Sequence, residues 1–329
     1  MKSRGRFNLT TLAIVGAGIA AHSLIFTLAK EKKNFSKIFL IDDKNLFPPC
    51  TLSSTAVVAA RGVNEDLSPL GKLLHEGYQT FKDHFDHDSP EGVKKVIHTQ
   101  LGRKDDDKFI QRFGTLPETS SFQSFPLTQP YSKYEEEAFI INPAIYLNWL
   151  WEKSQGVSRI NDAVISVQSN ELFFKSGDKL IADQIVFCAG VYQKFFLPEL
   201  SSKSIQGAYL ESHHQLKDRA SFSLTVDGIN LIYHHDLSMI LLGSTSKEAF
   251  HFLASQDELK KILTKARREV SDLPPYESWK IRVGLREKAK KRMPYCIRDQ
   301  EGRIFLGGYY KNGFSVALKM AKNLTHQFL

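Results

Sequence analysis

LAIVGAGIAA at residues 12–21 is followed, after a segment of helical character, by IFLID at residues 38–42. A short apolar strand therefore runs into Gly-x-Gly-x-x-Ala, and a second apolar strand ends on an acid. This order of strand, glycine turn, helix, strand and acid is typical of a βαβ unit that binds an adenine dinucleotide. The alternative is a buried βα turn that binds no ligand.

The residue types in this stretch suit a pyrophosphate group. Gly16 allows a tight turn out of the strand, and Gly18 lets the phosphates approach the backbone. Ala21 is small enough for the helix to pack closely on the strand. The helix begins at Ile19 and Ala20, where free N–H groups and the positive end of the helix dipole attract an anion.

Asp42 ends the second strand, and its carboxylate can accept hydrogen bonds from ribose hydroxyls. The same charge would repel the 2′-phosphate of NADP. Asp43 is either a second cofactor contact or a solvated neighbour. An enzyme that uses NAD alone is a further alternative for this βαβ unit.

Composition sets the outer bounds. The chain has 329 residues, of which 42% are hydrophobic, and this length suits two domains. The formal charge of +8 includes basic clusters at residues 30–33, 267–268 and 288–292. They are either solvated surface or a surface for an acidic partner such as nucleic acid.

The three cysteines lie far apart in the sequence, which predicts no disulfide framework and a reducing, cytoplasmic location. Paired histidines at residues 213–214 and 234–235 would point to opposite faces of a strand, so we expect no metal site. Apolar stretches are too short to predict a membrane span.

Other segments predict the elements around the βαβ unit. Helical patterns cover residues 66–86, 144–155, 256–271 and the C-terminal segment after residue 313. Buried strands are expected at residues 184–190 and 303–308, and β-rich structure is expected over residues 205–247. Asn142 is the expected N-cap of the second helix, with Pro143 at its first position. Residues 93–140 are expected to form short strands and loops, with prolines as breakers.

Five motifs occur in a defined order: GAGIAA at 16–21, SSTA at 53–56, VFCAG at 186–190, GLR at 284–286, and a glycine-rich turn from 307 into NGFS at 312–315. Together they resemble the FAD-dependent amine and amino-acid oxidases, the family of D-amino-acid oxidase, glycine oxidase and sarcosine oxidase. The resemblance covers nearly the whole chain.

This resemblance implies an α/β (α+β overall) fold. A Rossmann-like FAD-binding domain would be built from residues 1–75, 141–200 and 280–329. An inserted antiparallel β-sheet substrate domain would comprise residues 76–140 and 201–279. Besides the residues of the βαβ unit, the expected FAD contacts are Ser53, Ser54, Thr55, Ala56, Ala189, Gly190, Gly308, Asn312, Gly313, Phe314 and Ser315.

The resemblance also implies a reaction, in which the C–N bond of a small amine or amino acid is oxidised by hydride transfer to FAD and the resulting imine hydrolyses. Arg286 would bind the substrate carboxylate, as the matching arginine does in that family; a structural ion pair is the alternative, and Arg282 is a nearby competitor. Tyr309 would line the substrate face, or serve only in packing. The helix that begins near Gly313 would stabilise the negative charge of the reduced flavin.

A second resemblance concerns residues 84–88, 99–102 and 283–294. These segments are similar to the oxidase half of the bacterial enzyme that matures 5-methylaminomethyl-2-thiouridine in tRNA, so a modified tRNA base is an alternative substrate. A flavoprotein with a binding role is a third possibility. The substrate, the electron acceptor and the oligomeric state stay open.

Overall fold

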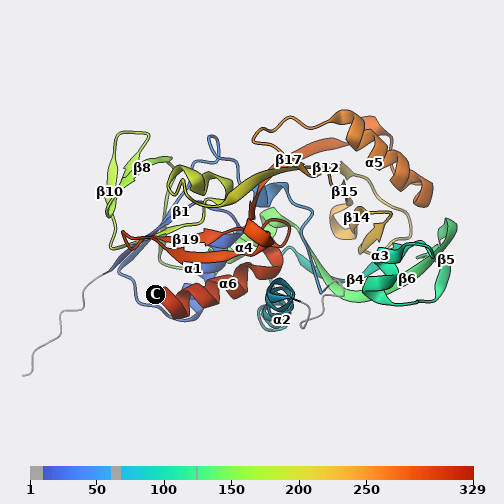
Figure 1. Cartoon of the computed structure of the whole chain (residues 1–329), viewed down its shortest axis with the longest axis horizontal. Coiled ribbons are helices and arrows are strands. Elements are labelled where there is room, and N and C mark those ends of the chain that lie inside the picture. The colour runs from blue at the N-terminus through green and yellow to red at the C-terminus, as the bar shows by residue number, and fades with distance from the viewer. Residues whose placement is uncertain (1–9, 61–67, 124) are drawn as a thin grey trace, which may run out of the picture.

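The computed structural model describes residues 10–60, 68–123 and 125–329. Two large sheets lie along the long axis of the molecule, with helices packed around each of them (Figure 1). The helices are α1 (Ile19–Lys30), α2 (Pro69–Asp88), α3 (Asp107–Phe113), α4 (Pro143–Glu152), α5 (Gln256–Glu269) and α6 (Gly313–Phe328), with short 3-10 helices η1 (Cys50–Ser53) and η3 (Gly190–Phe195).

The strands complete the two large sheets and a small third one. They are β1 (Thr11–Val15), β2 (Lys37–Ile41), β3 (Val57–Ala59), β4 (Val93–Gly102), β5 (Glu118–Phe122), β6 (Phe125–Ile141), β7 (Val157–Ile160), β8 (Val164–Gln168), β9 (Glu171–Phe174), β10 (Lys179–Ile181), β11 (Gln184–Phe187), β12 (Ser202–His213), β13 (Phe222–Val226), β14 (Ile229–His234), β15 (Met239–Gly243), β16 (Lys247–Glu248), β17 (Lys280–Ala289), β18 (Tyr295–Arg298) and β19 (Ile304–Gly307).

Strands that are distant in the sequence form the first sheet, in the order β18-β19-β11-β1-β2-β7. β1 pairs in parallel with β2 and β11, and β11 pairs in parallel with β19. Ile14, Val186 and Ile304 on these strands are fully buried, as expected when both faces of a parallel sheet are covered. The carboxyl ends of the four strands therefore meet at one edge of the sheet.

Helices cover one face of this sheet and a small sheet covers the other. α6 packs against α1 and α2 (Figure 1), and Gly77 of α2 sits directly against the carbonyl of Ser315, where a β-carbon would not fit. On the opposite face, the antiparallel sheet β10-β9-β8 packs Leu172 and Phe174 into the same apolar cluster as Phe187. Both faces of the first sheet are therefore buried.

The ten-stranded sheet has the order β16-β12-β15-β14-β13-β4-β6-β3, with β17 paired to β12 and β5 to β6. α5 covers this sheet by burying Leu259 and Leu263 in a cluster with Leu231 and Leu242. Ser255 caps α5 by accepting the Glu258 N–H at 3.3 Å. In Figure 1 this sheet and α5 occupy the right half of the molecule.

Several local expectations are confirmed. The opening βαβ unit forms, and Asn142 caps α4 by accepting the Ala144 and Ile145 N–H groups, with Pro143 at the first helical position. The expectation of short strands and loops over residues 93–140 is wrong, because β4 and β6 are long strands. Pro130 lies in β6 where the register with β5 shifts, a position that does not require its missing N–H.

The predicted domain boundaries stay a prediction. The boundary after residue 75 falls inside α2, which packs on α6. β17, which the prediction groups with the FAD-binding segments, pairs with β12 along its whole length. Within the described ranges, the search for a helix with the length and apolar character of a membrane span found none.

Candidate active site

A cavity of about 290 Å³ opens at the carboxyl edge of the first sheet and extends to β17 of the ten-stranded sheet. Most of the residues expected from the sequence line it. They are Gly16, Gly18, Ile19, Ala20, Asp42, Asp43, Ser54, Thr55, Ala56, Ala189, Gly190, Arg286, Gly308, Tyr309, Gly313 and Phe314. The fold thus brings five distant segments of the chain to one site.

Four expected residues lie behind this lining, and their cofactor contacts stay predictions. Ala21 is fully buried in α1. Ser53 lies against Gly284 of β17. Asn312 is the N-cap of α6, and Ser315 lies in its first turn beside α2.

The first glycine turn is too tight for any other residue. Gly16 has a φ of +101°, and a β-carbon there would lie 2.7 Å from the Cys188 carbonyl oxygen. Its N–H donates to the Ile41 carbonyl at 2.8 Å. Gly16 therefore closes the ends of β1, β2 and β11 around the cavity.

Thr51 completes the N-terminus of α1, although it was not among the contacts expected from the sequence. Its Oγ1 accepts the Ile19 N–H at 2.9 Å and would lie 3.0 Å from a β-carbon on Gly18. Thr51 belongs to the hydroxyl-rich loop after β2, and that composition is the sequence signal for its role. Ser54 in the same loop accepts the Ala56 N–H at 3.1 Å, so it shapes the loop.

Asp42 has the properties of a ribose-binding carboxylate. Its side chain is buried, and Oδ2 has no hydrogen-bond partner among the described residues. Burial raises the pKa of Asp42, while the positive charges of Arg159 and Lys44 lower it. The Arg159 guanidinium lies 4.0 Å from Oδ2. Asp43 instead accepts the N–H groups of the turn that follows, with Leu46 at 3.2 Å. A buried acceptor without a donor fits a ligand that brings hydroxyl groups.

A buried carboxylate holds the second glycine turn, between β19 and α6. Oε2 of Glu287 accepts the Gly308 N–H at 2.8 Å, and Oε1 accepts the Tyr295 hydroxyl at 2.6 Å. Burial raises the pKa of Glu287, while these hydrogen bonds lower it. Gly308 has a φ of +75°, and a β-carbon there would lie 2.7 Å from that of Ala289. The turn is therefore fixed directly beneath the cavity.

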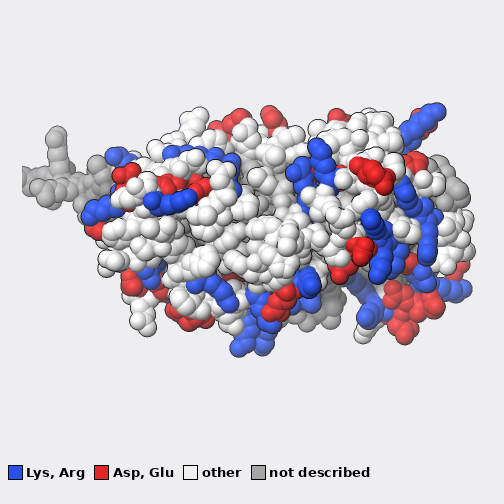
Figure 2. Space-filling model, turned by 90° about the horizontal axis from the view of Figure 1, so that it is seen from above, with Lys and Arg blue, Asp and Glu red and all other residues white. Residues whose placement is uncertain are grey.

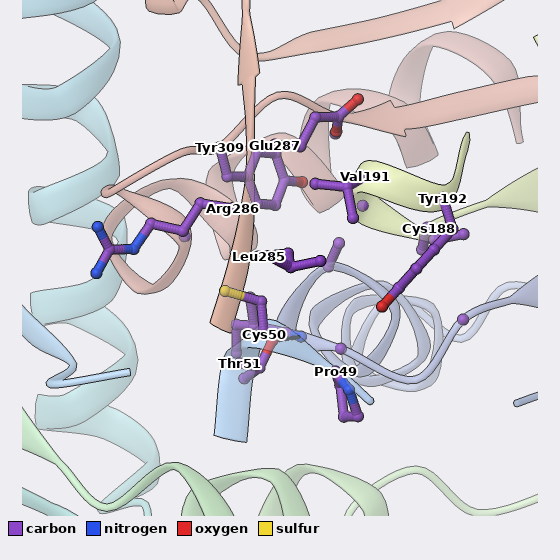
Figure 3. A pocket seen from close by; sticks show the side chains of 18 of the residues that line it. Pro49, Cys50, Thr51, Cys188, Val191, Tyr192, Leu285, Arg286, Glu287 and Tyr309 are labelled. Atoms are coloured by element: carbon purple, nitrogen blue, oxygen red, sulfur yellow. Dashed lines mark hydrogen bonds between the residues drawn. The ribbon is translucent and has the colours of Figure 1, made fainter. Parts of the chain in front are cut away.

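Arg286 extends from β17 away from Glu287 and Tyr309 (Figure 3). Its Nη2 donates to Ser244 Oγ at 3.2 Å, and its buried Nη1 has no hydrogen-bond partner among the described residues. The guanidinium lies against Gly207, where a β-carbon would collide with it. Arg282, the competing candidate, forms a two-point ion pair with Glu211 at 2.7 and 3.1 Å.

Tyr309 and Cys50 contribute neutral groups to the cavity. The Tyr309 hydroxyl is buried without a described hydrogen-bond partner, and burial raises its pKa well above its ordinary value. Burial likewise raises the pKa of Cys50 to about 11, which the charge of Arg286 only partly opposes. Neither group is a base at neutral pH.

Further lining residues lacked a sequence signal. Phe47, Tyr192 and Phe195 form an aromatic cluster, with Phe47 and Tyr192 ring centroids 4.8 Å apart. They come from the loop after β2 and from η3. Only the fold brings these two segments together.

The segment at residues 84–88 lies away from this cavity. His84 is buried among the rings of Phe26, Tyr146 and Trp149, and its Nδ1 is 2.8 Å from Asp88. It lines a separate, smaller pocket beside α1 and α2. Within the described ranges, no group of three or more His, Cys, Asp or Glu residues could hold a metal ion.

A family described as FAD dependent oxidoreductase matches residues 11–327. No curated protein sequence matches the chain significantly.

Three solved structures illustrate the likeness in fold. Glycine oxidase from Geobacillus kaustophilus has a TM-score of 0.76 at 15% identity, covering 97% of this chain and 94% of that one. Iminodiacetate oxidase from Chelativorans sp. BNC1 has a TM-score of 0.76 at 17% identity, covering 94% and 93%. L-proline dehydrogenase from P. horikoshii has a TM-score of 0.73 at 12% identity, covering 97% and 94%.

The residues at the cavity fit FAD. The Gly16 turn and the N-terminus of α1 suit its pyrophosphate, and the unpartnered Asp42 oxygen suits its ribose. Since the family match extends over nearly all of the sequence, the chain belongs to the FAD-dependent oxidoreductase family, and its cofactor is FAD.

Proposed function

We propose that this enzyme oxidises the C–N bond of a small amino acid or secondary amine whose carboxylate Arg286 binds. The supporting observation is the state of that side chain. Arg286 lines the cavity, and its buried Nη1 lacks a described hydrogen-bond partner. Arg282, by contrast, is already paired with Glu211. A half-buried guanidinium with one buried, unpartnered nitrogen and no counterion among the described residues is suited to an anionic ligand.

Arg286 would fix the substrate by its carboxylate. A planar guanidinium binds a carboxylate through two parallel hydrogen bonds, which sets both position and orientation. The space above Gly207 lets the guanidinium lie flat, and Ser244 holds Nη2. The carbon next to the amine is then directed toward the cofactor side of the cavity.

When bound, FAD supplies the acceptor for the hydride and its two electrons. The substrate loses that hydride and the amine proton, and water hydrolyses the resulting imine to a carbonyl compound and an amine. Among the described residues near Arg286, Cys50 and Tyr309 stay protonated at neutral pH and Glu287 accepts the Gly308 N–H, so none of these three takes the amine proton. The positive charge of Arg286 favours loss of the amine proton on binding.

The N-terminus of α6 would assist charge development at the cofactor. α6 begins at Gly313, and Gly313 and Phe314 line the cavity. The free N–H groups and positive dipole end of this helix stabilise negative charge placed before them. Gly308 lies in the turn before α6, and its hydrogen bond to Glu287 fixes that turn beside the cavity.

The test compares anaerobic flavin reduction in two arginine variants. Arg286→Ala should lower kcat/KM for a carboxylate substrate by about 10²-fold, the scale of one lost buried charge contact. Arg282→Ala, on the same strand, should change stability but leave substrate affinity intact. Equal effects of the two substitutions, or unchanged kinetics in Arg286→Ala, would assign Arg286 a structural role.

A modified tRNA base is the second candidate, supported by the net charge of +8. On the face seen in Figure 2, however, Lys and Arg side chains are intermixed with Asp and Glu. RNA binding that weakens steeply with added salt would support this candidate. Salt-independent turnover of a free amino acid would favour the first.

A further inference from the structure

Arg286 is accompanied by a second cation on the same face of β17. Lys288 lies two residues further along the strand, and alternate residues of a strand point to the same side. Their Cα atoms are therefore about 7 Å apart. Glu287, between them, turns to the other face, where it binds Gly308 and Tyr295.

Tyr310 connects these cations to the cavity. The Lys288 and Lys311 ammonium groups lie 5.7 and 5.5 Å from the centre of its ring. Its hydroxyl is 3.2 Å from Ser246 Oγ, and Tyr310 and Lys311 line the same cavity as Arg286. Burial raises the pKa of Tyr310, but the Ser246 hydrogen bond and the charges of Lys311, Arg286 and Lys288 lower it below its ordinary value. Three positive charges thus act on one hydroxyl. It borders the part of the cavity that Tyr310 and Lys311 line, which we call the cavity mouth.

The charges of Arg286 and Lys288 are not balanced locally. Among the described residues, no carboxylate lies within ion-pair distance of either side chain. The neighbouring strand provides a contrast, because Lys203 stands opposite Lys288 and pairs with Glu248 at 2.9 Å. The field at the mouth therefore attracts anions.

We propose that Lys288, Tyr310 and Lys311 form a second anion subsite, which binds an additional carboxylate or phosphate group of the same small substrate. This inference rests on the proposed function, in which Arg286 takes the first carboxylate. The spacing along β17 suits two anionic groups separated by a short chain. Tyr310 donates a hydrogen bond to the second group, and the two lysines supply charge. The preferred substrates are therefore dianionic amines.

The experiment measures how non-oxidisable carboxylates bind to the FAD-loaded enzyme, from the change in its visible flavin spectrum. Butyrate and succinate are matched in chain length and differ by one carboxylate, as do valerate and glutarate. We expect the dianion of at least one pair to bind about tenfold more tightly, the scale of one charge-assisted hydrogen bond. The oxidisable pair N-methylglycine and iminodiacetate should show the same preference in KM.

Variants assign this preference to the subsite. Lys288→Met keeps the unbranched side chain, so it should remove the dianion preference while butyrate affinity falls far less, and Lys288→Arg should keep the preference. Lys280→Met, at the far end of β17, removes the same charge and should have no effect. Tyr310→Phe tests the same subsite if Lys288→Met does not yield folded holoenzyme.

The outcomes separate the two proposals. If butyrate binds and the dianions bind no more tightly, or if Lys280→Met removes the preference as fully as Lys288→Met, the second subsite is overturned and the proposed function stands. If neither anion binds, both are overturned. If tRNA displaces succinate but inorganic phosphate does not, the mouth binds RNA and the small-substrate assignment is wrong.

Discussion

The carboxylate of Glu287 accepts the backbone N–H of Gly308 at 2.8 Å. This hydrogen bond joins β17 of the ten-stranded sheet to the turn between β19 and α6, which lines the cavity. The Glu287 carbonyl also accepts the Tyr310 N–H at 3.0 Å. One residue therefore connects the cofactor turn to the strand that carries Arg286.

Glu287→Gln should weaken FAD binding. The neutral amide removes the charge from the hydrogen bond to Gly308, and the Tyr295 hydroxyl must then accept from its NH₂ group instead of donating to a carboxylate. We expect the Kd for FAD to rise about tenfold or more, since a hydrogen bond to a charged group contributes about 1.5–3 kcal/mol. Fluorescence titration of the apoprotein with FAD measures this. Tyr295→Phe is the control, because it leaves the Gly308 bond intact; an equal loss in both variants would refute the specific role of that bond.

Thr51→Val should loosen the N-terminus of α1 without changing side-chain volume. The Ile19 N–H loses its acceptor at 2.9 Å, and one neutral hydrogen bond contributes about 1 kcal/mol. The Kd for FAD should rise about fivefold, whereas Thr51→Ser should match the wild type. Unchanged FAD affinity in Thr51→Val would show that Thr51 does not organise this site.

Gly207→Ala should displace the Arg286 guanidinium. The backbone of Gly207 is not in the left-handed region, so the substitution adds no backbone strain, but the new methyl group collides with the guanidinium. We expect KM for a carboxylate substrate to rise about tenfold with little change in Tm. Ser244→Ala removes the hydrogen bond to Nη2 without a collision, so it should raise KM less than Gly207→Ala does. A KM unaffected by Gly207→Ala would contradict the proposed position of Arg286.

Stability should fall in mild acid, in part through His234. Burial lowers its pKa from 6.5 to about 4, so the unfolded chain binds this proton more readily than the folded one. The contribution to stability is complete above pH 6.5 and is lost as the pH falls toward about 4, by up to about 1.4 kcal/mol per pH unit. Thermal unfolding between pH 7 and 5 measures this loss. His234→Leu should reduce the slope, and an unchanged slope would exclude His234 as a contributor.

Local sequence signals predicted the part of the cavity that lies at the edge of the first sheet. Gly16, Gly18 and Asp42 act within one βαβ unit, where the turn, the helix start and the strand end are set by neighbours in the chain. The N-cap at Asn142 was predictable for the same reason. A local pattern marks each of these positions, although Gly16 also packs against the distant Cys188 carbonyl.

The part of the cavity around Arg286 depends on contacts between distant segments. β17 was not recognised as a strand, because its alternating pattern mixes buried Glu287 with charged Arg286 and Lys288. Nothing local indicates that Glu287 will meet Gly308 or that Gly207 will make room for Arg286. Likewise, Pro130 is accommodated in β6 by a register shift against β5, which only the pairing reveals.

The most direct test of the account is the visible spectrum of the purified holoenzyme before and after anaerobic addition of amines and amino acids. We predict an oxidised flavin spectrum that is bleached by carboxylate-bearing amines, and far less readily by the matching amines without a carboxylate. A flavin that no small amine bleaches would contradict the proposed reaction, and bleaching that ignores the carboxylate would contradict the role of Arg286.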